Sequence, residues 1–392
     1  MNAIPRLKDY QGPAFLSYGF RPFFFLGASY AALVIAIWLA IYEGEVVLPT
    51  NFAPRDWHVH EMLFGYLAAV VTGFLLTAVP NWTGRLPLQG VPLLVLVVTW
   101  LAGRIAVAIS AKTGPVIAGV IDSAFLILVV AAVAREIIAG RNWRNLKVLI
   151  PVSIFALANI GFHAEACAFG IADVTIRVGI ATIIVLIMLI GGRVVPSFTR
   201  NWLARQSPGP LPAPFGKFDA VAIAFGVAAL GVWAVSPAGV WTGLALMAAG
   251  LFQALRLARW AGYRTGRDGL VVVLHVAYSF IPLGFVLLAL GAFDVLPPSA
   301  GLHAWMVGAA GTMTLAVMTR ATLGHTGRAL VAGPGTRAIY AAIVIAACAR
   351  IAAALLPQWT FVLLHLSAVA WVAAFGSFAL LYGPLLFRKK IS

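Results

Sequence analysis

Charged residues and cysteines are scarce in this sequence. Of its 392 residues, 10% are charged and 62% are hydrophobic, whereas a soluble domain typically carries about 25% charged residues. This composition excludes an ordinary soluble protein and predicts a polytopic membrane protein. The two cysteines, Cys167 and Cys348, form no CxxC pattern, so a disulfide framework and a cysteine-cluster metal site are also excluded.

Acidic residues are rarer than basic ones, with 12 against 27 and a formal net charge of +15. Such an excess can indicate nucleic-acid binding. Here the basic residues lie in short loops at the ends of apolar runs, where they set the orientation of membrane helices. We therefore expect membrane lipids as partners and no nucleic acid. The sequence also lacks the CxxCH motif of covalently attached haem and the Walker A motif of nucleotide sites.

Twelve apolar runs are long enough to cross a bilayer. If the N-terminus is cytoplasmic, the 27 Lys and Arg residues divide 22 to 5 in favour of the cytoplasmic side. This division predicts an all-α protein of twelve transmembrane helices in the bacterial cytoplasmic (inner) membrane, with both termini cytoplasmic. The predicted spans lie near 22–42, 59–79, 92–111, 115–139, 147–169, 174–195, 218–235, 239–257, 270–291, 302–322, 337–356 and 361–386.

Short sequence matches relate the second, sixth and tenth spans. The matches are HEMLFG (60–65) with HAWMVG (303–308) and TGR (83–85) with TGR (326–328), both at an offset of 243, and VPNWT (79–83) with VPSFT (195–199). Matches at every fourth span predict three groups of four helices within one integral membrane domain. The groups are roughly 1–145, 146–265 and 266–392. Two halves of six helices, as in many transporters, fit this pattern less well.

Five of the seven histidines fall on one side of this topology. An ionisable residue inside a membrane is costly and is usually kept for function, and imidazole is the commonest metal ligand. The pattern therefore predicts metal held inside a helical bundle. The five are His58, His60, His163, His303 and His365.

His58 and His60 are two residues apart, and a helix advances about 100° per residue. On a regular helix they point about 200° apart and cannot bind one ion together. If the helix begins after His60, an extended His-x-His segment can hold one copper ion instead. Two separate centres and one shared ion both stay open from the sequence.

Several charged side chains lie within apolar runs at a similar depth. Buried charges need partners, so we expect these residues to pair or to hold water around a site. Structural ion pairs that fix helix packing are the alternative interpretation. The residues are Arg104, Arg177, Arg350, Glu61, Asp122 and Glu165.

A layout of three four-helix arcs resembles the catalytic subunit of haem–copper oxidases. In that family the second span carries a haem-ligating histidine followed by a glycine-rich stretch and an Asn-aromatic element, which His60, Gly73 and Asn81-Trp82 match. The histidine near the outer end of its tenth span is matched by His303. The copper-binding histidines of its sixth and seventh spans have no counterpart here. We therefore do not expect dioxygen reduction at the usual oxidase centre.

Longer motifs resemble the NnrS family along almost the whole chain. They are LSYGFRPFF (16–24), WHVHEMLFGY (57–66), GFLLTAVPNWTGR (73–85), GRVVPSFTRNW (192–202) and HAWMVGAAGTMTLAVMTRATLGHTGR (303–328). The family is described as haem- and copper-containing integral membrane proteins associated with denitrification and nitric oxide stress. The resemblance implies haem, copper and nitric oxide, whereas composition and spacing alone imply only buried metal.

With haem implied, His60 and His303 are the first choice for its axial ligands, because they occupy equivalent positions in the repeat. A haem held by two histidines transfers electrons, whereas a single histidine leaves a site for nitric oxide or another diatomic. The haem is expected to be noncovalent and b-type. Glu61, next to His60, could carry protons or orient a ligand.

The remaining outer histidines, His58, His163 and His365, form a candidate copper site. Three imidazoles suit copper, and a soft ligand such as Met62 or Cys167 would favour Cu(I). Each histidine also has a structural interpretation, as a hydrogen-bonding group between helices.

Two histidines lie toward the cytoplasmic side. His275 and His325 could hold an inner haem whose propionates meet Arg193, Arg320 or Arg328, since the guanidinium fork suits carboxylates. The alternative is a set of orienting arginines with a histidine at a helix end.

The leading hypothesis is a haem–copper membrane protein that binds or transforms nitric oxide or its adducts. Reduction would need electrons, with a quinol or a periplasmic cytochrome as the candidate donor, and would make the protein an oxidoreductase. A twelve-span transporter of a metal, haem or small solute is the second hypothesis. A factor that holds haem only in passing is the third.

Overall fold

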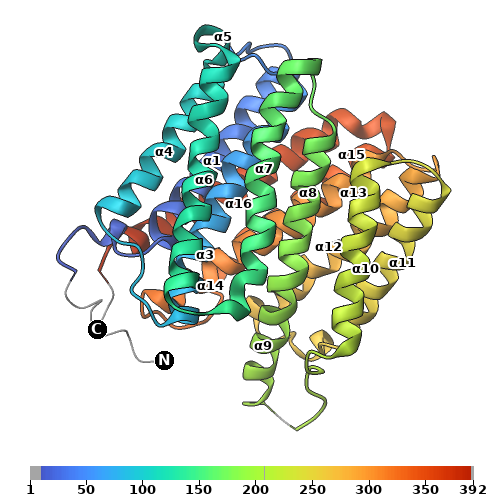
Figure 1. Cartoon of the computed structure of the whole chain (residues 1–392). Helices are drawn as coiled ribbons and strands as arrows, with labels where there is room; N and C mark the ends of the chain where they lie inside the picture. Colours follow the sequence, from blue (N-terminus) through green and yellow to red (C-terminus); the bar gives the residue numbers. More distant parts are fainter. Residues whose placement is uncertain (1–9, 207, 390–392) are drawn as a thin grey trace. The chain divides into compact units, whose positions relative to one another are not determined.

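The computed structural model describes residues 10–206 and 208–389, and this part of the chain is helical without any strand. Within it, twelve helices are long and apolar enough to cross a membrane, as the sequence predicts (Figure 1). They run Phe20–Tyr42 (α1), Pro54–Thr83 (α2, η3 and α3), Val91–Ala108 (α4), Pro115–Ala139 (α6), Leu146–Phe169 (α7), Val174–Leu203 (α8, η5 and α9), Lys217–Val235 (α10), Val240–Arg264 (α11 and η6), Gly269–Ala292 (α12), Pro298–His325 (α13, η7 and α14), Pro334–Leu355 (α15) and Pro357–Phe387 (η8 and α16).

Proline and glycine mark many of the helix ends. Pro54 and Pro115 occupy the first turns of α2 and α6, where the missing amide hydrogen costs no helical hydrogen bond. Gly84 and Gly170 end α3 and α7 with φ angles of 70° and 79°, a left-handed conformation that glycine adopts without strain. These signals place the start of the second span five residues before the predicted one.

Three of the described spans contain a π-helical segment. These segments are Glu61–Leu67 (η3), Ile187–Gly191 (η5) and Ala304–Gly311 (η7), in the second, sixth and tenth spans. Two of them begin directly after a histidine, and their first residues are 243 positions apart, the offset of the sequence repeat. Because π-helical turns occur frequently at functional sites, a functional site is expected near these spans. The three-group arrangement itself stays a prediction.

The chain divides into two compact units. The first comprises Met1–Gly179, Ala321–Arg328 and Phe378–Ser392, and the second comprises Ile180–Arg320 and Ala329–Ser377. Within the first unit, α6 packs against α4 and α7, and α3 packs against α1 and α6. Within the second unit, α11 packs against α10 and α12, and α12 packs against α13 and η7.

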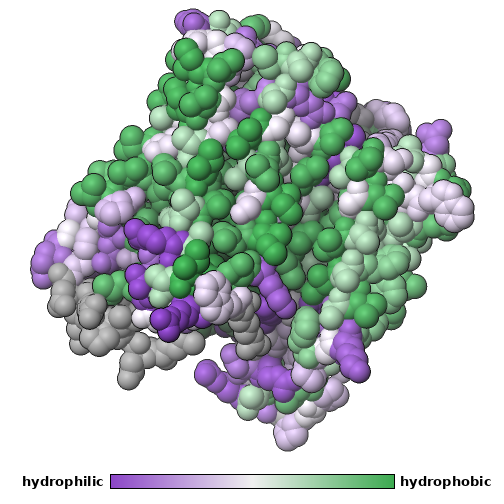
Figure 2. Space-filling view, viewed as in Figure 1, coloured by the Kyte–Doolittle hydropathy of each residue, from purple (hydrophilic) through white to green (hydrophobic). Residues whose placement is uncertain are grey.

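The outward side chains of α6 and α7 are mostly apolar. Val116, Val120 and Ile127 of α6 and Leu157 of α7 are exposed, and Figure 2 shows hydrophobic surface over both helices. An apolar exterior of this kind suits contact with lipid chains. Polar side chains of these helices therefore have to find partners on the inner side.

Candidate metal centre

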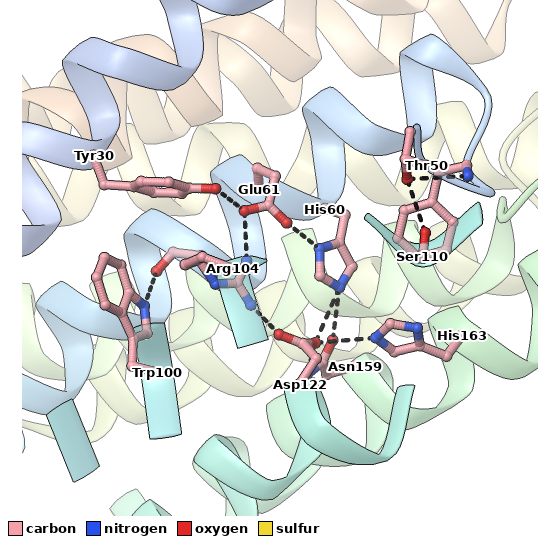
Figure 3. Close-up of polar contacts among 12 residues, drawn as sticks. Tyr30, Thr50, His60, Glu61, Trp100, Arg104, Ser110, Asp122, Asn159 and His163 are labelled. Atoms are coloured by element: carbon pink, nitrogen blue, oxygen red, sulfur yellow. Dashed lines mark hydrogen bonds and ion pairs between the residues drawn. The ribbon is translucent and has the colours of Figure 1, made fainter. Parts of the chain in front are cut away.

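Three polar side chains from three helices of the first unit converge inside it. His60 ends α2 (Pro54–His60), Asp122 lies in the first third of α6, and His163 lies in the last third of α7. One ligand atom from each lies within 4.8 Å of the other two. Figure 3 shows both imidazole rings turned toward the Asp122 carboxylate. Two imidazoles and a carboxylate make a ligand set that a metal ion could occupy.

The distances within this cluster are short. His60 Nε2 lies 3.2 Å from Asp122 Oδ2, and His163 Nε2 lies 3.0 Å from the same oxygen. The side chains of His60 and Asp122 are 0% and 1% exposed, whereas that of His163 is 10% exposed. His60 and Asp122 are therefore fully buried, and His163 is the residue of these three that reaches the surface of the unit.

A second layer of side chains holds these groups in place. Glu61 Oε1 accepts a hydrogen bond from His60 Nδ1 at 2.8 Å, and Glu61 Oε2 accepts from Tyr30 and from Arg104 Nη1, the latter at 2.6 Å. Arg104 also donates to Asp122 Oδ1. A carboxylate behind a histidine is the arrangement that orients metal-binding imidazoles. Three of the six charged side chains predicted at this depth, Glu61, Arg104 and Asp122, therefore pair with one another, as expected from the sequence.

An amide on α7 completes the surroundings of Asp122. Asn159 Nδ2 donates to Asp122 Oδ2 at 2.9 Å, and Asn159 Oδ1 lies 3.1 Å from His60 Nε2. Asn159 and His163 are four residues apart and share one face of the helix. That spacing could have indicated a joint role, but an asparagine carries no charge to single it out in an apolar span. Asn159 was therefore not among the residues predicted from the sequence.

The hydrogen bond to Glu61 fixes the protonation of His60. A carboxylate only accepts hydrogen bonds, so Nδ1 must carry a proton. In the neutral ring, Nε2 then has a lone pair, and this lone pair faces two acceptor oxygens, Asp122 Oδ2 and Asn159 Oδ1. Such a contact is favourable only with a cation between the atoms, either a proton or a metal ion.

The charges of the cluster lead to the same requirement. With both imidazoles neutral, the two carboxylates of Glu61 and Asp122 face the single guanidinium of Arg104. One negative charge is left over in a buried place, where an unbalanced charge is costly. One added positive charge, on a protonated histidine or a monovalent metal ion, makes the cluster neutral.

His58 does not share this site. Helix α2 begins at Pro54 and includes both histidines, so the alternative of an extended His-x-His segment is wrong. The His58 ring stacks on Trp38 instead, with ring centroids 4.5 Å apart and an interplanar angle of 18°. The two histidines thus face different neighbours, as a regular helix requires.

Three further residues were predicted as copper ligands beside His58 and His163. Cys167 is exposed on α7 and does not belong to the group of described residues that converge on Asp122. Met62 is half-buried in η3. His365 lies in the second unit, where its Nδ1 donates to the carbonyl of Phe361 at 2.8 Å. The assignment of these residues to a copper site stays a prediction.

The predicted haem ligand His303 also belongs to the second unit. Its Nδ1 donates to the Ser299 carbonyl at 2.7 Å, which makes Nε2 the basic nitrogen of the neutral ring. His60 has both nitrogens within hydrogen-bond distance of Glu61, Asn159 and Asp122 and is fully buried. Its surroundings fit a compact ion at Nε2. Axial pairing of His60 with His303 stays a prediction.

The residues predicted for an inner haem are divided between the units. In the second unit, His275 Nε2 lies 2.8 Å from Thr199 Oγ1, and Arg320 lies over the Phe198 ring at 4.0 Å. In the first unit, the His325 ring packs between Tyr18 and Phe20, with centroid distances of 5.6 and 5.3 Å. Arg193 and Arg328 are exposed. Their roles as propionate partners stay predictions.

Comparison with known families matches the description "NnrS protein" over residues 14–390. The chain belongs to the NnrS family. The resemblance inferred from the motifs is thereby confirmed, and it covers nearly every residue of the described structure. No curated protein matches the chain. For this member of the NnrS family, the His60–Asp122–His163 cluster is a place where a metal ion could be held.

Proposed function

We propose that this NnrS-family protein binds a copper ion at His60, Asp122 and His163 and that this centre binds or transforms nitric oxide or its adducts. The observation that carries the proposal is the convergence of two imidazole nitrogens and one carboxylate oxygen within 4.8 Å in a buried place. Nitric oxide enters through the family resemblance. Bound copper would supply one-electron redox chemistry and a coordination position for a small ligand.

Charge balance favours Cu(I) over a divalent ion. The cluster carries one excess negative charge when its imidazoles are neutral, so a monovalent ion neutralises it without a further ligand. Two histidines and a carboxylate are also the ligand set of non-haem iron(II) sites. Iron is therefore the second metal to be measured.

The surrounding residues have defined tasks in this proposal. Glu61 holds the His60 ring with Nε2 toward the ion, and Asn159 and Arg104 hold Asp122 from its two oxygens. Because Glu61 is ion-paired with Arg104, we assign it to orientation of His60. A role for Glu61 as a proton carrier stays a prediction.

Haem enters the proposal only through the second unit. His303 and His365 each donate from Nδ1 to a backbone carbonyl, the contact that orients metal-ligating histidines through the other nitrogen. We therefore keep His303 as the candidate axial ligand of a noncovalent haem and assign His60 to the metal centre. The bacterial inner membrane, with both termini cytoplasmic, is the proposed location.

Metal analysis of the purified full chain tests the proposal. We expect about one copper per chain in the wild type, and a loss of most of that copper in His163→Ala and Asp122→Ala. His58→Phe is the matched control, because it changes the neighbouring histidine while keeping a ring against Trp38. Equal copper content in all four proteins would overturn the proposed site. Iron in place of copper would keep the site and change the identity of the proposed metal to iron.

A functional measurement separates this proposal from transport. Membrane vesicles that contain the wild type should change their copper spectrum on exposure to nitric oxide, and the Asp122→Ala vesicles should not. A metal that stays bound in stoichiometric amount through purification would contradict a transporter whose cargo is that metal. Copper uptake into vesicles without any response to nitric oxide would favour the transporter.

A further inference from the structure

An apolar groove of about 530 Å³ lies between α6 and α7 of the first unit. Its α6 wall runs from Pro115 to Ile127, and its α7 wall runs from Ile160 to Ala168. The twelve residue steps from Pro115 to Ile127 correspond to a length of roughly 18 Å. The groove lies on the apolar face of α6 and α7 shown in Figure 2, so lipid chains can reach it.

His163 is the one side chain shared by this groove and the metal cluster. Its Nε2 faces Asp122 at 3.0 Å, while its Nδ1 edge lies toward Gly119, where an added Cβ would come within 3.4 Å of Nδ1. Nδ1 makes no hydrogen bond with any residue that the structure describes. Since an unpaired polar atom next to hydrocarbon is costly, the groove calls for a ligand with a polar group at this point.

The hydrogen-bonding character of Nδ1 depends on what Nε2 does. When Nε2 donates its proton to Asp122, Nδ1 is an acceptor and suits a hydroxyl group. When Nε2 ligates a metal ion, Nδ1 carries the proton and suits an acceptor oxygen, which a hydroxyl or a carbonyl group provides. A hydroxyl group, which both donates and accepts, can therefore pair with this ring edge in either state.

We propose that this groove binds an isoprenoid quinol, with a ring oxygen hydrogen-bonded to His163 Nδ1 and the isoprenoid chain along α6 and α7. A quinol combines a ring oxygen that can pair with His163, a residue of the groove wall, with a long apolar chain that suits the rest of the lining. The volume lies in the range of sites for organic ligands, about 300–1,000 Å³. A phospholipid chain offers no polar group to Nδ1, and a diatomic gas would leave most of the length unfilled.

The proposal assigns a binding site. Binding does not require the metal, because His163 lines the groove with or without an ion at Nε2. Use of the quinol as an electron donor to the centre rests on the proposed function. The two proposals therefore fail separately.

The binding of decylubiquinol, a short-chain quinol with a fully substituted ring, tests the site. The full chain is placed in phosphatidylcholine nanodiscs, and bound quinol is measured at equilibrium. We expect saturable binding of one molecule per chain. Ala168→Phe, which fills the groove from its exposed end, should weaken binding at least tenfold. His163→Phe, which keeps a ring and removes the nitrogens, should weaken it by roughly three- to tenfold, the loss that goes with one neutral hydrogen bond.

Ala131→Phe is the matched control, since Ala131 is an exposed alanine of α6 beyond the groove. It should bind decylubiquinol as the wild type does. A second readout uses Cys167, which lines the groove: in a Cys348→Ser background, the quinol should slow its alkylation by a membrane-permeant maleimide.

Two results would overturn the quinol site. The first is equal affinity in the wild type, Ala168→Phe and His163→Phe. The second is equal protection of Cys167 by a simple ten-carbon alcohol, which would mean a groove for lipid chains only. Copper measured in the same samples separates the two proposals. Ala168→Phe should keep its copper while it loses quinol, and unchanged quinol binding with unchanged copper would overturn the quinol site and leave only the metal centre.

Discussion

Arg104 Nη1 lies 2.6 Å from Glu61 Oε2, and the two side chains are 6% and 0% exposed inside membrane-spanning helices. The same guanidinium also contacts Asp122. One cation thus bridges the carboxylate that orients His60 and the carboxylate proposed to bind the ion. The stability of the first unit and the affinity of the centre should therefore depend on the same residue.

Replacing Arg104 by Met should destabilise the protein strongly. Removal of the cation leaves two buried carboxylates without their partner, and breaking a buried ion pair from one side costs about 3–5 kcal/mol. Arg104→Lys keeps the charge but loses the guanidinium fork that reaches both carboxylates, so its loss of stability should be smaller than that of Arg104→Met. Unfolding of the purified protein in mixed detergent measures both. Equal stability of Arg104→Met and the wild type would contradict the role of the ion pairs.

Gly65→Ala should disturb the same cluster by steric means. A Cβ at this position would lie 2.8 Å from Arg104 Nη1 and 2.9 Å from a ring carbon of Tyr30, which is closer than real side chains pack. We expect the free energy of unfolding to fall by about 1–3 kcal/mol, and copper retention to become weaker. Gly231→Ala, on α10 with open space around it, should be neutral or stabilise by up to about 1 kcal/mol.

Glu61→Gln should weaken the metal centre without removing a ligand. The change takes away the negative charge that accepts the His60 Nδ1 proton, and loss of such a partner typically lowers metal affinity 10- to 100-fold. Competition with a copper chelator measures the change. Glu136→Gln provides the control, because Glu136 pairs with Arg85, which is 44% exposed, outside the cluster. An unchanged affinity in Glu61→Gln would remove Glu61 from the proposed site.

Glu165→Ala should affect stability alone. The Glu165 carboxylate accepts hydrogen bonds from the backbone amides of Asp173, Val174 and Thr175 and from the Thr175 hydroxyl, at the start of α8 (Val174–Leu186). Loss of this cap should cost about 1–3 kcal/mol. Copper content should stay at the wild-type level, and a parallel loss of copper would show that the cap also supports the site. Glu45→Ala, at an exposed loop position, is the stability control.

The sequence predicted the helices well because hydrophobic runs and their ends are local signals. Two of its errors at helix ends concern the second and sixth spans, which it ended at Val79 and Val195, directly before prolines. The structure continues both helices through Pro80 and Pro196 to Thr83 and Leu203. Proline is tolerated there because neighbouring groups in a membrane bundle satisfy the freed carbonyls.

The composition of the site was only partly visible in the sequence. His60, His163, Glu61, Arg104 and Asp122 were all recognisable as ionisable residues within apolar runs. The pairing of the charged ones was correctly predicted for Glu61, Arg104 and Asp122. Which helices face one another was not a local property, so His163 was grouped with His58 and separated from His60. Only the packing of α2, α6 and α7 brings His60 and His163 to one carboxylate.

The π-helical segment Glu61–Leu67 makes the direction of the His60 side chain sensitive to the insertion or deletion of one residue. A π-helical turn contains one residue more than a regular turn would, and each residue corresponds to about 100° of rotation. Loss of a single residue from this segment would give an ordinary α-helix. The following part, α3, could keep its packing, while the His60 side chain would be rotated away from Asp122. One insertion or deletion in the π-helical segment thus changes the direction of the His60 side chain. A metal site could be gained or lost in this way without any change in the packing of α3.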